Sequence, residues 1–222
     1  MAAIPQFLIN PKTVVIDPGH GGAGHIGGSD GNHAVSPSGV LEKDMTLDLA
    51  QLVETQLNNF GGNRLNVILT RDADVNLSLA DRANVARDNQ ADIFVSIHFN
   101  GFNGVTRGIE AFVRPAPGNV NLADDTALAQ RVLEAAFRAI HTRDAATNNR
   151  GVKQMKLGVL DDTALGNTAA NHPCRACLLE VEFIDVPAVD VLLNTGPNAD
   201  QVRREIAAAI KNGILDDLAA HP

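Results

Sequence analysis

The sequence predicts an α/β fold, in which a single domain is built on a mostly parallel, twisted sheet of about six strands with helices on both faces. Two observations lead to this prediction. Apolar runs of strand length alternate from end to end with longer segments of helical period. No internal repeat, low-complexity tract or long linker divides the 222 residues. A chain of this size needs no disulfide framework, because it buries roughly 70% of its surface on folding.

Short runs rich in apolar residues predict the strands, which cover 13–17, 65–70, 92–98, 108–113, 155–160 and 176–183. Apolar side chains at intervals of three and four residues predict helices over 45–60, 78–89, 123–141, 187–193 and 199–218. Gly61 and Gly62 end the first of these helices. Strands that alternate with helices favour parallel pairing in a sheet that is covered on both faces. We assign 1–12 to an N-terminal extension and 13–222 to the domain.

Composition excludes several classes of function. The formal net charge of -8 argues against binding to nucleic acid or to an anionic membrane. The longest apolar runs are too short to cross a bilayer, so we expect no membrane insertion. The chain has no Trp and no Tyr, which argues against a sugar-binding module built on aromatic side chains.

Polar side chains follow the predicted strands at the edge where α/β proteins form their sites. His20 follows the first strand, His98 ends the third, and Glu180 and Glu182 lie two residues apart in the last. With Glu42 before the first long helix, two histidines and a carboxylate match the three protein ligands of a catalytic zinc. From spacing alone, however, a lone histidine is more often a hydrogen-bonding residue, and Glu42 can equally stabilise the helix dipole.

Five motifs occur in a fixed order along the chain: D-P-G-H-G-G at 17–22, E-K-D at 42–44, T-R-D at 70–72, S-I-H-F-N at 96–100 and L-L-E-V-E-F-I-D at 178–185. In sequence and order they resemble the motifs of the zinc-dependent N-acetylmuramoyl-L-alanine amidases, a family of cell-wall enzymes. The resemblance covers the chain from about Val14 to its C-terminus.

Carried over residue by residue, the resemblance implies zinc ligands at His20, Glu42 and His98, with one Zn²⁺ per chain, and a catalytic glutamate at Glu180. It implies hydrolysis of the amide bond between N-acetylmuramic acid and L-alanine in peptidoglycan, as in an autolysin or endolysin. Glu180 would take a proton from the attacking water and return it to the leaving amine. We expect a monomer whose partner is peptidoglycan or a muropeptide, and 13–222 would be the amidase catalytic domain.

The chain departs from the family pattern at Glu182, where the family has Gly, and at Asp185, where it has Asn. Glu182 should project on the same face of the strand as Glu180 and close to the metal, which makes a secondary role in the site one interpretation. The other interpretation is that Glu182 pairs with an arginine or lysine. Arg71 and Arg82 are expected to form structural ion pairs under the rim of the sheet.

Cys174 and Cys177 follow His172 in H-x-C-x-x-C order. This order admits a redox pair or a second metal site, but a structural zinc needs four ligands and only three candidates are local. We favour two thiols beside a packed strand.

Three other functions are weighed against the amidase. A catalytically silent peptidoglycan-binding module of the same fold has no chemical need for all four of His20, Glu42, His98 and Glu180. A zinc hydrolase that acts on another amide stays open. The G-x-G-x-x-G sequence at 19–24 also fits a dinucleotide-binding oxidoreductase, but the helix that should open inside that motif starts only at Glu42.

We expect the protein to act on the cell wall, in the periplasm or outside the cell. The first residues contain no recognisable signal peptide. The export route is therefore open, and phage lysis, an injected effector or a shortened chain would each fit.

Overall fold

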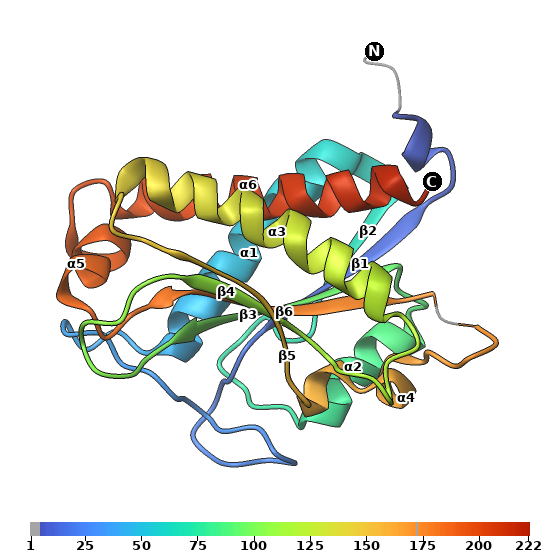
Figure 1. Ribbon diagram of the computed structural model, residues 1–222, viewed down its shortest axis with the longest axis horizontal. Helices are drawn as coiled ribbons and strands as arrows, with labels where there is room; N and C mark the ends of the chain where they lie inside the picture. Colours follow the sequence, from blue (N-terminus) through green and yellow to red (C-terminus); the bar gives the residue numbers. More distant parts are fainter. Residues whose placement is uncertain (1–4, 172) are drawn as a thin grey trace.

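The structure is a computed structural model that describes residues 5–171 and 173–222. Its sheet has the strand order β2-β1-β3-β6-β4-β5 (Figure 1). The strands are β1 (Lys12–Pro18), β2 (Leu65–Leu69), β3 (Ile93–Asn100), β4 (Ile109–Val113), β5 (Asn149–Gln154) and β6 (Arg175–Phe183). The strands β2, β1, β3 and β6 are parallel, whereas β4 runs antiparallel to β6 and parallel to β5. The prediction of one domain on a mostly parallel sheet of about six strands is confirmed.

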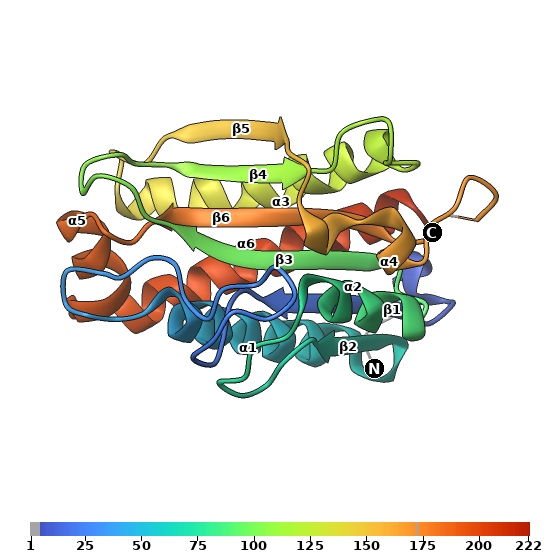
Figure 2. The same ribbon diagram turned by 90° about the horizontal axis from the view of Figure 1, so that it is seen from below.

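Helices cover both faces of this sheet, as predicted (Figure 2). The long helices α1 (Glu42–Gly61), α3 (Leu122–Arg143) and α6 (Ala199–Ala220) enclose the larger core on one face. On the other face, α2 (Leu79–Asp88) and α4 (Asp162–Leu165) enclose a smaller core. The short helix α5 (Pro187–Asp190) follows β6. No helix within the described ranges is long and apolar enough to span a membrane.

Strand β1 shows how one strand contributes to both cores. Val14 and Ile16 are buried in the larger core and Val15 in the smaller one, as the alternation of side chains along a strand requires. Leu8, in the segment predicted to be an extension, is also buried and packs in the larger core.

The fifth strand lies earlier in the chain than predicted. The predicted strand at 155–160 is wrong, because this stretch is a loop that ends in a 3₁₀ turn over Gly158–Leu160. Val159 and Leu160 are apolar because they pack in the smaller core, not because they pair with another strand. The actual strand β5 is polar, as is common for an edge strand that pairs on one side only.

The buried carboxylate of Asp17 connects β1, β3, the segment after β2 and the helix α2. Asp17, near the end of β1, lies 2.9 Å from the guanidinium of Arg82 in α2. Thr70 after β2 and Ser96 in β3 donate hydrogen bonds to the same carboxylate, at 2.5 and 2.7 Å. Burial acts to raise the pKa of Asp17, but the charge of Arg82 and these hydrogen bonds outweigh it, so the pKa is lowered. Asp17 is therefore charged inside the fold.

Two arginines hold the loop that follows β1. Arg82 donates to the carbonyl oxygens of Pro18 and His20, at 2.8 and 2.6 Å. Arg71 donates to the carbonyl oxygens of Pro18 and Gly19, at 3.0 and 2.8 Å. The expected ion pair is present for Arg82, whereas the hydrogen bonds of Arg71 go mainly to backbone carbonyls. The path of the loop is thus set by guanidinium donors under it.

We expect the change Arg82→Met to lower the free energy of unfolding by about 3–5 kcal/mol, because it leaves Asp17 charged, buried and unpaired. Arg87→Met is a matched control on the same helix, since its ion pair with Asp88 is exposed to solvent, and it should change stability by less than about 1 kcal/mol. Urea unfolding at neutral pH measures both. Equal losses in the two variants would contradict the structural role of Arg82.

Candidate metal centre and active site

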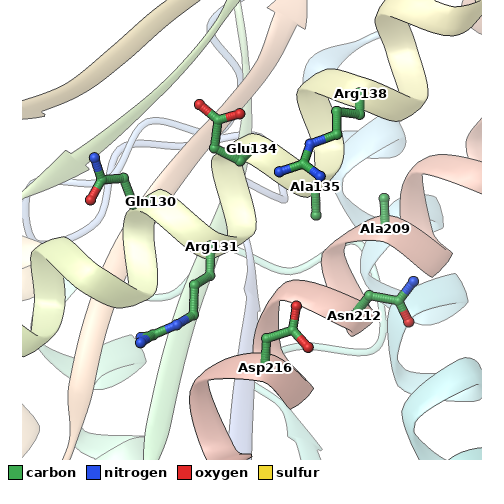
Figure 3. A pocket seen from close by; sticks show the side chains of 8 residues that line it. All are labelled: Gln130, Arg131, Glu134, Ala135, Arg138, Ala209, Asn212 and Asp216. Atoms are coloured by element: carbon green, nitrogen blue, oxygen red, sulfur yellow. The ribbon is translucent and has the colours of Figure 1, made fainter. Parts of the chain in front are cut away.

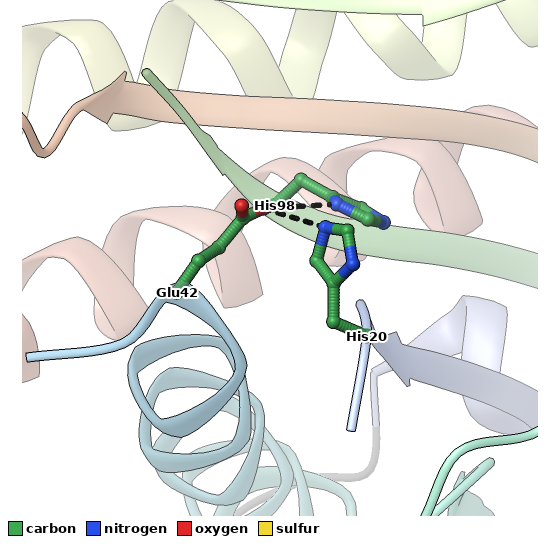
Figure 4. Close-up of side chains that lie close together, drawn as sticks. All are labelled: His20, Glu42 and His98. Carbon is green, nitrogen blue, oxygen red and sulfur yellow. Dashed lines mark hydrogen bonds and ion pairs between the residues drawn. The ribbon is translucent and has the colours of Figure 1, made fainter. Parts of the chain in front are cut away.

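His20, Glu42 and His98 meet at the carboxyl edge of the sheet, although they come from three separate elements (Figure 4). His20 lies in the loop after β1, Glu42 is the first residue of α1, and His98 lies in β3. One potential ligand atom of each residue lies within 4.8 Å of the others. The backbone of His20 has a φ of 60°, in the left-handed region that non-glycine residues rarely adopt. The hydrogen bond from Arg82 to the carbonyl of His20 holds the backbone at this point.

The Glu42 carboxylate is the centre of the cluster. Its Oε1 lies 3.1 Å from His20 Nε2 and 3.1 Å from His98 Nδ1. The backbone N–H groups of Phe99 and Ala34 donate to its two oxygens, at 3.1 and 3.0 Å. Burial acts to raise the pKa of Glu42, but the hydrogen bonds to His20 and His98 lower it well below its usual range. Burial acts to lower the pKa of His20, but the hydrogen bond to Glu42 and the negative charge of Glu42 outweigh burial, so the pKa is raised.

This donor set fits zinc. Two imidazoles and one carboxylate are enough protein ligands for a catalytic site that keeps one position open. Tetrahedral ligands at usual Zn–N and Zn–O distances lie about 3.3 Å apart, close to the 3.1 Å between the Glu42 oxygen and each imidazole nitrogen. The other ring nitrogen of His20 lies 2.9 Å from the carbonyl oxygen of Asp30, a contact of the kind that orients metal-binding imidazoles. The three residues predicted from the sequence thus form a group that could hold a metal ion.

The side chains of His20, Glu42 and His98 line a cavity with a volume of about 470 Å³, and Glu180 lines the same cavity. It lies in register with His98 on one side and with Glu110 on the other. Its Oε2 is buried and has no hydrogen-bond partner among the described residues. Burial, followed by the charges of Glu42 and Glu110, raises the pKa of Glu180 well above its ordinary value. A carboxylate in this state beside a metal-ligand cluster is suited to exchange a proton. The other lining residues are His33, Phe99, Asn100, Phe112, Met155, Leu157 and Leu178.

Glu182 does not line this cavity, contrary to the expectation that it would share the side of Glu180. The pairing of β3 with β6 is irregular at this point, since His98 pairs with Glu180 but Asn100 pairs with Phe183. Such a bulge interrupts the alternation of side chains, and the rule that residues two apart share a face fails across it.

Glu182 is instead buried in a network of hydrogen bonds with Arg107, Thr147 and two backbone N–H groups. Arg107 Nε and Thr147 Oγ1 donate to its Oε1, at 3.1 and 2.8 Å. The backbone N–H groups of Gly108 and Phe183 donate to its Oε2, at 2.6 and 2.9 Å. Of the two interpretations, the arginine partner is the one that the structure contains.

Cys174 and Cys177 are buried free thiols that lie in different cores. Cys174 packs in the smaller core and Cys177 in the larger one, because an odd spacing along an extended strand places side chains on opposite faces. Burial, and next the charge of Asp125, raise the pKa of both thiols. The interpretation as a redox pair is wrong. His172, the third member of the pattern, lies outside the described residues.

Two further hollows are separate from the cavity that Glu180 lines. One of about 200 Å³ adjoins His20 and His98 on the α2 side, where Leu79, Val159 and Asp30 line it. The other, about 550 Å³, is lined by side chains of α3 and α6 (Figure 3). Its lining residues are Gln130, Arg131, Glu134, Ala135, Arg138, Ala209, Asn212 and Asp216. They include neither histidine nor cysteine, so size alone does not mark the functional site.

Sequence analysis assigned no role in the site to Glu110, a charged residue that lies beside the cavity. Glu110 in β4 accepts hydrogen bonds from Asn100, Arg150 and Lys153. Glu110 is a neighbour of Glu180 only because β4 pairs with β6. The order of strands in the sheet is not readable from the order of motifs, so no local signal in the sequence could have placed this group at the site.

Comparisons with known proteins agree with the fold. The family model for N-acetylmuramoyl-L-alanine amidase matches residues 14–214. An uncharacterised cell wall amidase of Bacillus anthracis is 33% identical over 218 residues, which cover 94% of this chain and 36% of that protein. The N-acetylmuramoyl-L-alanine amidase CwlM of Bacillus licheniformis is 33% identical over 172 residues, covering 78% of this chain and 56% of CwlM. The chain thus spans only about a third to a half of these relatives.

Two solved structures have the same architecture. The catalytic domain of CwlV, an amidase from Bacillus (Paenibacillus) polymyxa var. colistinus, superposes with a TM-score of 0.71 at 27% identity and covers 92% of this chain and 97% of that one. An N-acetylmuramoyl-L-alanine amidase from Clostridium difficile 630 gives 0.73 at 26% identity, with coverage of 93% and 96%. With the family match over most of its length and the His-Glu-His cluster in place, this chain belongs to the N-acetylmuramoyl-L-alanine amidase family.

Proposed function

We propose that this chain binds one Zn²⁺ through His20, Glu42 and His98 and hydrolyses the amide bond between N-acetylmuramic acid and L-alanine in peptidoglycan. The observation that carries the proposal is the unpartnered Oε2 of Glu180, which lies beside the cavity that the three ligands also line. A buried carboxylate oxygen without a donor is destabilising in a fold, and a site that exchanges protons with water gives it a use. The family membership of the chain supports the same reaction.

In this proposal each residue has a separate task. His20, Glu42 and His98 would hold the ion, which as a Lewis acid would lower the pKa of water to about 7 and polarise a carbonyl oxygen. Glu180 accepts the proton of the attacking water and returns it to the L-alanine nitrogen as the amide bond breaks. Burial and the neighbouring charges of Glu42 and Glu110 raise its pKa, which favours the protonated form that must donate to the leaving nitrogen.

The alternatives are less well supported. A silent wall-binding module would have no use for an unpartnered carboxylate beside three metal ligands. A hydrolase for another amide would share the cluster and differ only in the groups that contact substrate. We place the activity at the cell wall, in the periplasm or outside the cell, and we propose that a monomer carries it out.

We expect the protein to bind one equivalent of zinc, and we expect His98→Ala to weaken that binding by more than about 100-fold. Changes to residues that only orient a ligand cost about 10–100-fold, and loss of a ligand costs more. His33→Ala is the matched control, because His33 lines the same cavity and stacks on His20 at 6.4 Å but is outside the ligand cluster. Titration against a chelator of known affinity measures all three proteins. If His33→Ala and His98→Ala lost zinc equally, the ligand assignment would fail.

We expect zinc-loaded protein to release stem peptides with a free L-alanine amine from purified peptidoglycan. Metal-free protein should release none. Glu180→Gln should lower the rate by about 10²–10⁴-fold, because the substitution removes the group that exchanges the proton. Mass spectrometry of the soluble products measures the reaction.

Glu182→Gln separates the two neighbouring glutamates. Its effect should fall on stability, by about 3 kcal/mol, because an amide cannot accept from the same four donors. The turnover of the folded Glu182→Gln protein should stay close to that of the unchanged protein. A folded Glu182→Gln protein as inactive as Glu180→Gln would overturn this division of roles.

A further inference from the structure

Glu110, Arg150 and Lys153 form a cluster of charged side chains at one side of the cavity, and this cluster has more positive than negative charge. Glu110 forms ion pairs with both Arg150 and Lys153 and accepts a further hydrogen bond from Asn100. Burial acts to raise the pKa of Glu110, but these partners, Lys153 foremost, lower it, so one negative charge faces two positive ones. Within the described part of the chain, no second carboxylate lies within ion-pair distance of either cation. One unit of positive charge is left over.

Lys153 does not itself line the cavity but lies beside a residue that does. Its ammonium is 5.9 Å from the ring centroid of Phe112, and Phe112 lines the cavity. Met155, two residues further along the chain, lines the cavity as well. The side chain of Lys153 is 41% exposed, and an ammonium has three donors, of which Glu110 uses one. The remaining donors are accessible to a ligand.

The other side of the metal-ligand cluster has the opposite character. The charged residues that line the smaller hollow next to His20 and His98 are Asp17, Asp30 and Arg82, so two carboxylates outnumber one guanidinium there. An anionic group is therefore favoured on the β4–β5 side of the cluster and disfavoured on the α2 side.

The substrate class of the proposed function carries an anionic group at a suitable distance. In the stem peptide, L-alanine is followed by a D-glutamate that is linked onward through its γ-carboxyl group, which leaves its α-carboxylate free. Two extended residues place this carboxylate about 7 Å from the scissile carbonyl. The Lys153 ammonium contacts Glu110 on β4, which is level with His98 because both residues pair with Glu180 in β6, and two strands correspond to a lateral distance of about 10 Å. The difference between the 7 Å that the peptide spans and the 10 Å across the strands is about the length of one hydrogen bond, about 3 Å.

We propose that Lys153, held by Glu110 beside Arg150, binds the free carboxylate of the second stem residue and so directs the peptide half of the substrate across β6 and β4. This inference rests on the proposed function. It assigns Lys153 a role in substrate recognition and none in the chemistry at the amide bond.

The experiment compares two soluble muropeptides that differ only in the second stem residue, which carries either the free carboxylate or the corresponding carboxamide. With zinc-loaded protein we expect kcat/KM to be about fivefold to tenfold higher for the carboxylate, mainly through KM, since a charge-assisted hydrogen bond is replaced by a neutral one. Lys153→Met should bring the ratio of the two kcat/KM values close to one. Lys153→Arg keeps the charge and should restore most of the preference.

Lys211→Met is the matched control. The ammonium of Lys211 lies 5.7 Å from the ring of Phe60, in the same type of contact as Lys153, but on α6 and outside the residues that line the cavity. It should keep the full preference for the carboxylate. Thermal unfolding of each variant establishes that the comparison is made between folded proteins.

Binding of the free stem peptides, measured by calorimetry without turnover, separates this inference from the proposed function. If neither muropeptide is cleaved but the carboxylate peptide binds more tightly and Lys153→Met abolishes the difference, the amidase function fails and the carboxylate site stands. If both muropeptides are cleaved equally well, or if Lys153→Met keeps the preference of the unchanged protein, the carboxylate site is overturned and the amidase function stands.

Discussion

The buried contact between Asp17 and Arg82 is the constraint on which the site depends. It joins the end of β1 to α2, and the same guanidinium holds the carbonyl of His20 in a backbone conformation that is unfavourable for a histidine. An ion pair of this kind contributes little net stability compared with a packed apolar pair, but breaking it leaves a charge inside the protein. The contact thus specifies one position for the loop, and that position brings His20 to Glu42 and His98.

The three carboxylates at the site are distinguished by their partners. Glu42 is kept charged by two imidazoles, and Glu110 is kept charged by Arg150 and Lys153. Glu180 lies between them, without a donor to its buried oxygen, and its pKa is raised in part by the charges of the other two. Carboxyl groups of similar intrinsic acidity are in this way given different protonation behaviour by their surroundings. The proton-exchanging role in our proposal follows from this distribution of partners.

Much of the architecture could be predicted from the sequence. The strands near 13–17, 65–70, 92–98 and 108–113 and the long helices were found because hydrophobic period is a local property of the chain. The strand predicted at 155–160 was wrong because Val159 and Leu160 are buried by a loop that packs under α2, and burial of this kind has the same composition as a strand. The edge strand β5 was not predicted, because its residues are mostly polar and form no apolar run.

For the site, the candidate ligands His20, Glu42 and His98 and the candidate base Glu180 could be named from the sequence, because short motifs at strand ends and at a helix start are local in the chain. The folded chain was needed to show that these residues meet, that Glu182 pairs with Arg107, and that Glu110 and Lys153 lie beside Glu180. The reason is physical. A bulge in β6 changes the face on which a side chain projects, and the order of strands in a sheet is set by how all the helices and strands pack together. Neither is encoded in any one segment.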